Sequence, residues 1–148
     1  MTSKFTPPDM ILVFVGLEIL LHYLFPIKQI ATSPYNYLGI LLIILGAIPN
    51  FWIYFHFKRK ATTTKIYENP KVLVTSGLFK ISRNPNYLGM AVLLLGIAIL
   101  LGSLITFIFP ILFIVLADIF VIRKEEKNLE KTFGKRYLEY KKKVRRWI

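Results

Sequence analysis

Long apolar blocks that exclude nearly all charge constrain this chain more than any other feature. They occupy roughly residues 10–25, 37–57, 87–101 and 104–122, and each is bounded by proline, glycine or charge. A helix needs about 20 apolar residues to cross about 30 Å of hydrocarbon. The second and fourth blocks meet that length, and the shorter third block joins the fourth in a tight hairpin that can tilt. The sequence therefore predicts an all-α, polytopic membrane protein with about four transmembrane helices in a single domain.

Composition narrows the class of protein further. The chain is 55% hydrophobic, yet it carries 20 Lys and Arg against 8 Asp and Glu, for a formal net charge of +12. A soluble nucleic-acid-binding protein would spread its basic residues over a polar surface, whereas here they avoid the apolar blocks. No nucleic-acid partner is predicted. With no cysteine and only two histidines far apart, no metal site is expected either.

Basic residues gather on one predicted side of the membrane. Seven lie in the segment 58–85 and eleven in the tail from residue 123, and Lys4 joins them once four helices have crossed, which leaves Lys28 on the other side. Positively charged loops stay in the cytoplasm. Both termini are therefore predicted to be cytoplasmic, in a prokaryotic cell membrane. No small-residue cleavage site follows the first apolar run, so that run is expected to stay as a helix.

The two basic segments are longer than a bare bundle requires. Segment 58–85 has 28 residues and the tail has 26, whereas helix connections in bundles commonly have about 2 to 8. Apolar residues of the tail recur at spacings of three or four: Leu129, Phe133, Tyr137, Tyr140 and Val144. This stripe predicts an amphipathic helix over 123–146. Two roles fit it: resting on anionic membrane lipids, and covering a site at the cytoplasmic mouth.

The stretch SRNPNYLG, residues 82–89, opens the third apolar block. Pro85 suits the first turn of a helix, and Asn84 or Ser82 can cap the free amides there. A helix N-terminus attracts anions, and the Arg83 guanidinium adds a fork for a carboxylate. The same residues equally suit a capped helix that is anchored at the lipid interface.

Three motifs in a set order resemble the isoprenylcysteine carboxyl methyltransferase and phospholipid methyltransferase family of integral membrane enzymes. They are LVTSG, RNPNY, and EEKNLEKTFGKRYLEY after the hydrophobic hairpin, and the resemblance runs from about Thr62 to Val144. The resemblance implies a methyl transfer from S-adenosylmethionine in a pocket that is not a Rossmann domain. The absence of any G-x-G-x-x-G stretch agrees with this.

By position, the resemblance implies that the loop 58–85 and the start of the next helix bind the cofactor. The cofactor-binding residues that it implies are Lys71, Val72, Leu73, Val74, Phe79, Asn84 and Tyr87. The best-known eukaryotic members have His at the positions of Lys71 and Asn84, and Tyr at that of Phe79. Asn can still hydrogen-bond a carboxylate or an ammonium, although it carries no charge.

The predicted catalytic set is Arg83, from its place at the helix start, together with Arg123, Glu125 and Glu126, which the resemblance implies. Arg123 and Glu126 would face the polar group of the substrate, and their spacing of three places them on one helix face. Arg123 would orient an acceptor carboxylate, while Glu126 would hold the cofactor ammonium or fix Arg123. With an amine acceptor, Glu126 would have to accept a proton. The stretch RKEEKNLEK also suits an ordinary salt-bridged helix start, and the spacing of seven predicts that Asp118 and Glu125 share a face.

The predicted function is transfer of a methyl group from S-adenosylmethionine to a lipophilic acceptor, foremost an isoprenylcysteine-type carboxylate. Such an acceptor is already ionised, so alignment and exclusion of water would suffice. A phospholipid N-methyltransferase is the alternative within the family. The expected partners are a lipophilic small-molecule or prenylated substrate and membrane lipids, and the sequence does not determine the oligomeric state.

Two other classes of protein fit part of the sequence. Glu18 and His22 lie four residues apart inside the first apolar block, where charge is costly. They predict a pairing with each other or with Asp118, a place in the bundle interior, or a small proton-coupled exporter that uses Glu18. A non-catalytic membrane anchor with the same fold is the third class.

Overall fold

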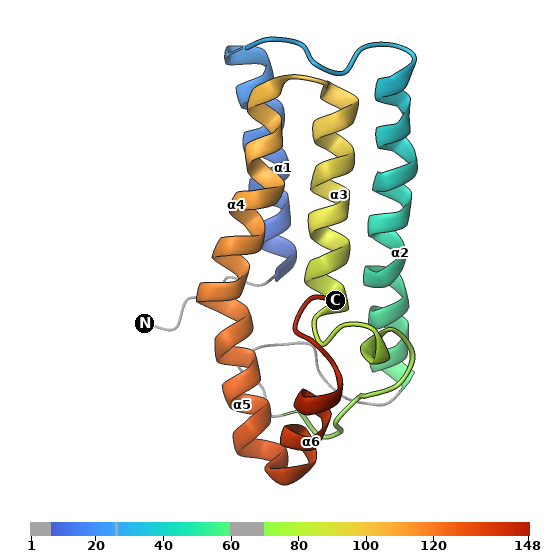
Figure 1. Cartoon of the computed structure of the whole chain (residues 1–148), viewed down its shortest axis with the longest axis vertical. Helices are drawn as coiled ribbons and strands as arrows, with labels where there is room; N and C mark the ends of the chain where they lie inside the picture. Colours follow the sequence, from blue (N-terminus) through green and yellow to red (C-terminus); the bar gives the residue numbers. More distant parts are fainter. Residues whose placement is uncertain (1–6, 26, 60–69) are drawn as a thin grey trace.

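The computed structural model describes residues 7–25, 27–59 and 70–148 of the chain. Its helices form an upright bundle (Figure 1). The long helices are α1 (Pro7–Leu24), α2 (Leu38–Arg59), α3 (Pro85–Leu101), α4 (Ile108–Ala117), α5 (Arg123–Phe133) and α6 (Lys135–Lys143). The short ones are η1 (Tyr35–Tyr37), η2 (Gly77–Lys80), η3 (Leu104–Phe107) and the π-helix η4 (Asp118–Ile122). The described residues contain no β-strand, so the predicted all-α class is confirmed.

Among the described residues, three stretches are helical, long and apolar enough to cross a membrane. They are Pro7–Leu24, Tyr35–Arg59 and Leu104–Phe133, and α3 adds a shorter apolar helix between them. The outer face of α2 leaves large apolar side chains such as Ile44 and Phe51 exposed, as contact with lipid requires. The chain is therefore an integral membrane protein, as predicted from its apolar blocks.

Two glycine pairs bring α2 and α3 into backbone contact. A Cβ atom built on Gly46 would lie 2.6 Å from the carbonyl oxygen of Gly89, and one on Gly96 would lie 2.7 Å from that of Gly39. Small residues permit this close approach of membrane helices. The pairing sets the register of the two helices. As a result, the second half of α2 extends beyond the first turn of α3 (Figure 1).

The tail differs from the single helix predicted over 123–146. The fourth membrane helix continues without interruption through η4 into α5, and the chain then breaks at Gly134 before α6 folds back. Gly134 has φ 51° and ψ −125°, a conformation that residues with a Cβ rarely adopt. The apolar stripe runs through the break at its regular spacing, so periodicity alone did not reveal it.

Glu18 lies in the bundle interior and is fully buried. Neither of its carboxylate oxygens, nor Nδ1 of His22, has a hydrogen-bond partner among the described residues. Asp118 instead pairs with Arg123 and Arg146. The structure therefore supports the interior position among the roles predicted for Glu18, and it shows neither of the predicted pairings.

Candidate active site

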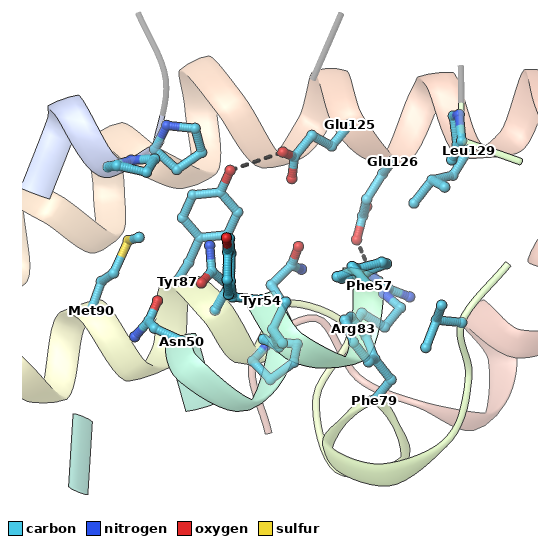
Figure 2. Close-up of a pocket in the computed structure, with 18 of the residues that line it drawn as sticks. Asn50, Tyr54, Phe57, Phe79, Arg83, Tyr87, Met90, Glu125, Glu126 and Leu129 are labelled. Atoms are coloured by element: carbon cyan, nitrogen blue, oxygen red, sulfur yellow. Dashed lines mark hydrogen bonds and ion pairs between the residues drawn. The ribbon is translucent and has the colours of Figure 1, made fainter. Parts of the chain in front are cut away.

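A cavity of about 1130 Å³ opens at the end of the bundle where α2 ends and α3 begins. Its walls come from the start of α1, the second half of α2, the segment 70–87, and the helices α5 and α6. Figure 2 shows side chains from these elements facing one another across it. A single small-molecule site commonly measures about 300 to 1,000 Å³, so this cavity is large enough for more than one ligand.

Most of the predicted cofactor-binding residues meet at this cavity. Those that line it are Val72, Leu73, Val74, Phe79, Asn84 and Tyr87. Lys71 is exposed and is not among the lining residues. Residues 60–69 of the predicted cofactor loop lie outside the described residues, as does Lys4. The binding of the cofactor by these residues stays a prediction.

Three of the four predicted catalytic residues also line the cavity, namely Arg83, Glu125 and Glu126. Arg123 does not. Its side chain is 61% exposed, and its Nε donates to Oδ2 of Asp118 at 3.0 Å. Arg123 thus lies outside the cavity lining, and its role toward a bound acceptor stays a prediction.

Glu126 forms the centre of a buried ionic cluster. Arg83 Nη2 lies 2.8 Å from its Oε1, and Arg146 Nη2 lies 2.8 Å from its Oε2. The side chains of Arg83 and Glu126 are only 8% and 5% exposed. Arg146 also reaches Oδ1 of Asp118 at 3.0 Å, and its hydrogen bonds to Glu126 are the main cause that raises its pKa. Arg83 is therefore mostly neutralised within the chain, although it lies at a helix start that attracts anions.

A π-helix explains how Asp118 and Glu126 reach the same arginine. Eight residues of regular α-helix turn about 80° beyond two full turns. One extra residue in a π-turn removes about 100° of this rotation and leaves a difference of about 20°. The η4 segment thus brings these two carboxylates onto one face. It also separates Asp118 from Glu125, which the regular spacing of seven had predicted to share a face.

The end of the chain folds back onto the start of α3. We call residues 144–148 the C-terminal strap. The N–H of Arg83 donates to the carbonyl of Arg145, and the side chains of Ser82 and Asn84 both donate to the carbonyl of Arg146. Trp147 packs against the bundle core. Figure 1 shows the C-terminus beside the first turn of α3.

This folding back changes the predicted capping of α3. Pro85 does occupy the first turn, as predicted. The Asn84 side chain makes no cap hydrogen bond there, and its Nδ2 donates to the carbonyl of Arg146 in the strap. The Ser82 hydroxyl accepts the N–H of Asn84 at 3.1 Å. Asn84 therefore joins the C-terminal strap to the cavity wall.

Glu125 contrasts with its neighbour Glu126. The buried Tyr87 hydroxyl donates to Glu125 Oε1 at 2.9 Å (Figure 2). Among the described residues no ion pair is formed with Glu125. A carboxylate in a cavity wall without a cation is suited to a positively charged or proton-donating ligand.

Several residues of the site were not predicted from the sequence. Tyr140 donates its hydroxyl to the carbonyl of Phe79 at 2.6 Å, and burial raises its pKa to about 12. Tyr137 is almost fully buried and lines the cavity beside it. The apolar stripe contained both residues, but it pointed equally to lipid. Arg146 had no distinguishing signal, because it stands in a terminal basic run.

The fold and the site together define a class: a polytopic membrane protein whose large cavity joins the basic end of the bundle to its apolar interior. Within this class, the chain belongs to the phospholipid methyltransferase family, which matches residues 34–136. The resemblance predicted from the three motifs is thereby confirmed.

Two relatives refine the comparison. The chain is 39% identical over 145 residues to the protein-S-isoprenylcysteine O-methyltransferase of Saccharomyces cerevisiae, covering 88% of this chain and 58% of the yeast protein. It is 40% identical over 62 residues to an uncharacterized protein of Haemophilus influenzae, covering 42% of this chain and 98% of that protein. The chain thus spans little more than half the length of the yeast relative. No solved structure matches the chain.

Proposed function

We propose that the protein transfers the methyl group of S-adenosylmethionine to a lipophilic acceptor, foremost a carboxylate of the isoprenylcysteine type. The observation that carries this proposal is the large cavity that a family member forms between its charged end and its apolar interior. The volume of about 1130 Å³ suits a cofactor and an acceptor held together. Placing the two reactants side by side is itself a large part of catalysis.

The donor set of the cavity fits the proposed cofactor. When bound, S-adenosylmethionine supplies an activated methyl group on a sulfonium and carries an ammonium and a carboxylate. Glu125, which forms no ion pair among the described residues, suits a cation, and the segment Val72–Val74 lines the same cavity. Phe79, Asn84 and Tyr87 would complete the binding wall, held in place by Tyr140, the C-terminal strap and Glu125.

Methylation of an ionised acceptor requires that the acceptor be oriented and that water be excluded, and it requires no general base. The Nε atom of Arg83 is buried and has no hydrogen-bond partner among the described residues. It is our candidate for orienting the acceptor carboxylate, while Glu126 holds the other end of the same guanidinium. This assignment replaces Arg123, which pairs with Asp118 outside the cavity.

The membrane orientation is part of the proposal. Among the described residues, the basic side chains of segment 70–85 and of α5, α6 and the C-terminal strap lie at the end of the bundle that carries the cavity, so we place that end, and both termini, in the cytoplasm of a prokaryotic cell. The polar cofactor would enter from the cytosol, and the acceptor would enter from the bilayer through the apolar walls. Reaction of the two would follow at the first turn of α3.

One observation favours a second candidate within the family. Glu125 has no cation partner in the described part of the chain, so it could accept the proton that an amine must lose when it is methylated. Phospholipid N-methylation is therefore the alternative. Glu18 is enclosed and does not line the cavity, so the proton-coupled exporter is not proposed.

The test is transfer of labelled methyl from S-adenosylmethionine in lipid nanodiscs. The acceptors are total lipid extract and a synthetic prenylcysteine, and the product that carries label identifies the acceptor class. Two asparagine variants form a matched pair, since each loses one hydrogen bond to a backbone carbonyl. Asn84→Ala removes a cavity-lining side chain, and Asn36→Ala removes one at the far end of α3.

We expect the protein to bind labelled cofactor at micromolar levels. Asn84→Ala should weaken that binding about tenfold or more, and Asn36→Ala should leave it within twofold. The proposal would be refuted if the protein bound no cofactor and transferred no labelled methyl to the lipid extract or to prenylcysteine. That result would favour the non-catalytic anchor.

A further inference from the structure

One part of the cavity, next to Tyr54 and Tyr87, has a mostly apolar lining. We call this part the inner arm. Its lining residues are Pro7, Pro8, Ile11, Ala47, Asn50, Phe51, Met90 and Leu93. They come from the start of α1, the middle of α2 and the first turns of α3. Asn50 is the polar member of this set, and Figure 2 shows it between Met90 and Tyr54, below the Tyr87 ring.

The two ends of the Asn50 amide are in different situations. Its Nδ2 donates to the carbonyl of Gly46 at 2.8 Å. Its Oδ1 is buried and has no hydrogen-bond partner among the described residues. Because a carbonyl can receive only the NH₂ end, this hydrogen bond also determines which end of the amide is the oxygen. The inner arm therefore contains one fixed, unused acceptor.

The backbone packing of α2 and α3 holds this acceptor in place. Gly89 is so close that a Cβ atom built on it would lie 2.9 Å from Asn50 Nδ2 and 2.6 Å from the carbonyl oxygen of Gly46. The side chain thus lies against the glycine contact and cannot turn freely. A buried acceptor without a partner costs free energy, and native structures rarely retain one without a reason. A bound donor would remove that cost, and the donor would meet an acceptor that is already oriented.

Asn50 lies away from one part of the residues proposed for the cofactor, the part around Phe79, and beside another, Tyr87 (Figure 2). Phe57 on α2 packs edge-on against Phe79, with ring centroids 5.8 Å apart. Asn50 precedes Phe57 by seven residues, which is about 10 Å along a helix. Asn50 therefore lies where the proposed cofactor residue Tyr87 adjoins the apolar walls that would hold a lipid chain.

We propose that Asn50 recognises the methyl acceptor: its Oδ1 accepts a hydrogen bond from an amide N–H that the acceptor carries next to its methylated carboxylate. This inference rests on the proposed function and adds to it a polar feature of the substrate. An N-acylated prenylcysteine has such an N–H, and its prenyl chain suits the apolar walls of the inner arm. An acid with the same chain and no amide lacks the donor.

The test compares three ligands in nanodiscs with saturating S-adenosylhomocysteine. They are N-acetyl-S-farnesylcysteine, its N-methylated amide, and 3-(farnesylthio)propionic acid, which has no amide. The proteins are the wild type, Asn50→Leu, and the control Met90→Leu, which alters the same arm without removing a hydrogen-bonding group. Binding is measured by calorimetry, and binding of labelled cofactor checks that each variant is folded.

We expect the wild type and Met90→Leu to bind the N–H amide about tenfold tighter than either other ligand, the size of one buried hydrogen bond. Asn50→Leu should reduce that preference to less than twofold and leave cofactor binding unchanged. The comparison of the N–H and N-methyl ligands on the wild type needs no variant, so a failure of Asn50→Leu to fold would not prevent a result.

Three results would overturn the inference: equal binding of the ligands by the wild type, a preference that persists in Asn50→Leu, or weaker cofactor binding in Asn50→Leu. Absence of binding by all three ligands would overturn it as well. In that case, labelled methyl transfer to total lipid extract would still decide the proposed function separately.

Discussion

The ionic cluster and the inner arm lie in one cavity and treat polar groups in opposite ways. In the cluster, both oxygens of Glu126 are used by Arg83 and Arg146, so its charges largely satisfy one another. In the inner arm, Asn50 Oδ1 has no partner among the described residues, and nearby Glu125 receives only a tyrosine hydroxyl. Satisfied groups hold elements together, whereas unsatisfied groups are available to ligands. Within the cluster, the atom that we propose for the acceptor is Nε of Arg83, and it too has no hydrogen-bond partner among the described residues.

The largest expected effect on stability and activity comes from a substitution in the ionic cluster. Glu126→Ala leaves the buried Arg83 and the adjoining Arg146 without their shared carboxylate. Breaking a buried ion pair costs about 3–5 kcal/mol, and α3, α5 and the C-terminal strap would lose their common contact. We expect a large fall in melting temperature in detergent and loss of methyl transfer. A variant that melts like the wild type would show that the cluster does not hold these elements together.

Glu125→Gln tests the other side of the comparison. Gln keeps an oxygen that can accept the Tyr87 hydroxyl, but it removes the negative charge. We expect cofactor affinity to fall about 10- to 100-fold, the size of a charge-assisted hydrogen bond, with little change in melting temperature. Equilibrium binding of labelled S-adenosylmethionine measures the first effect. Unchanged cofactor affinity combined with a lower melting temperature would show that Glu125 stabilises the fold and does not bind the cofactor.

The Tyr140 hydroxyl predicts an effect of pH on stability. Burial raises its pKa from 10.0 to about 12, so the folded state holds this proton more tightly than the unfolded state does. The resulting stabilisation is present below pH 10 and is lost as pH rises from about 10 to about 12. Melting temperature should therefore fall in that window.

Tyr140→Phe should make this fall shallower. The variant should also lose about 1 kcal/mol at neutral pH, because the hydrogen bond to the carbonyl of Phe79 is removed. Part of the pH dependence should remain, since burial raises the pKa of Tyr137 as well. An identical pH profile in Tyr140→Phe would contradict the role given to this hydroxyl.

The smallest effect is expected at Arg123. Its ion pair with Asp118 is exposed on the arginine side, and such pairs contribute about 0 to 1 kcal/mol. We expect Arg123→Ala to change kcat/KM by less than about threefold, because the side chain has no contact with the cavity. Retained cofactor binding with lost turnover would instead support the acceptor-orienting role predicted from the motif.

Much of the fold was predictable because membrane helices follow from local composition. The apolar blocks predicted at 10–25, 37–57, 87–101 and 104–122 correspond to helical segments in the structure, with ends that differ by a few residues except that the fourth helix continues to Phe133. The site was predictable only through its motifs, since Asn84 and Glu126 lie far apart in the sequence. The break at Gly134 and the π-helix escaped prediction because a periodic pattern assumes a regular helix.

The sequence alone determined that this chain enters a membrane and that its basic segments gather at one end, because hydrophobicity and charge act over single segments. Only the tertiary structure decided which polar side chains pair with one another and which remain without a partner among the described residues. The π-helix rotates Asp118 and Glu126 together, and the folded-back end supplies Arg146 to both. Such pairings depend on distances between segments that are remote in the chain, and those distances exist only after the helices have packed.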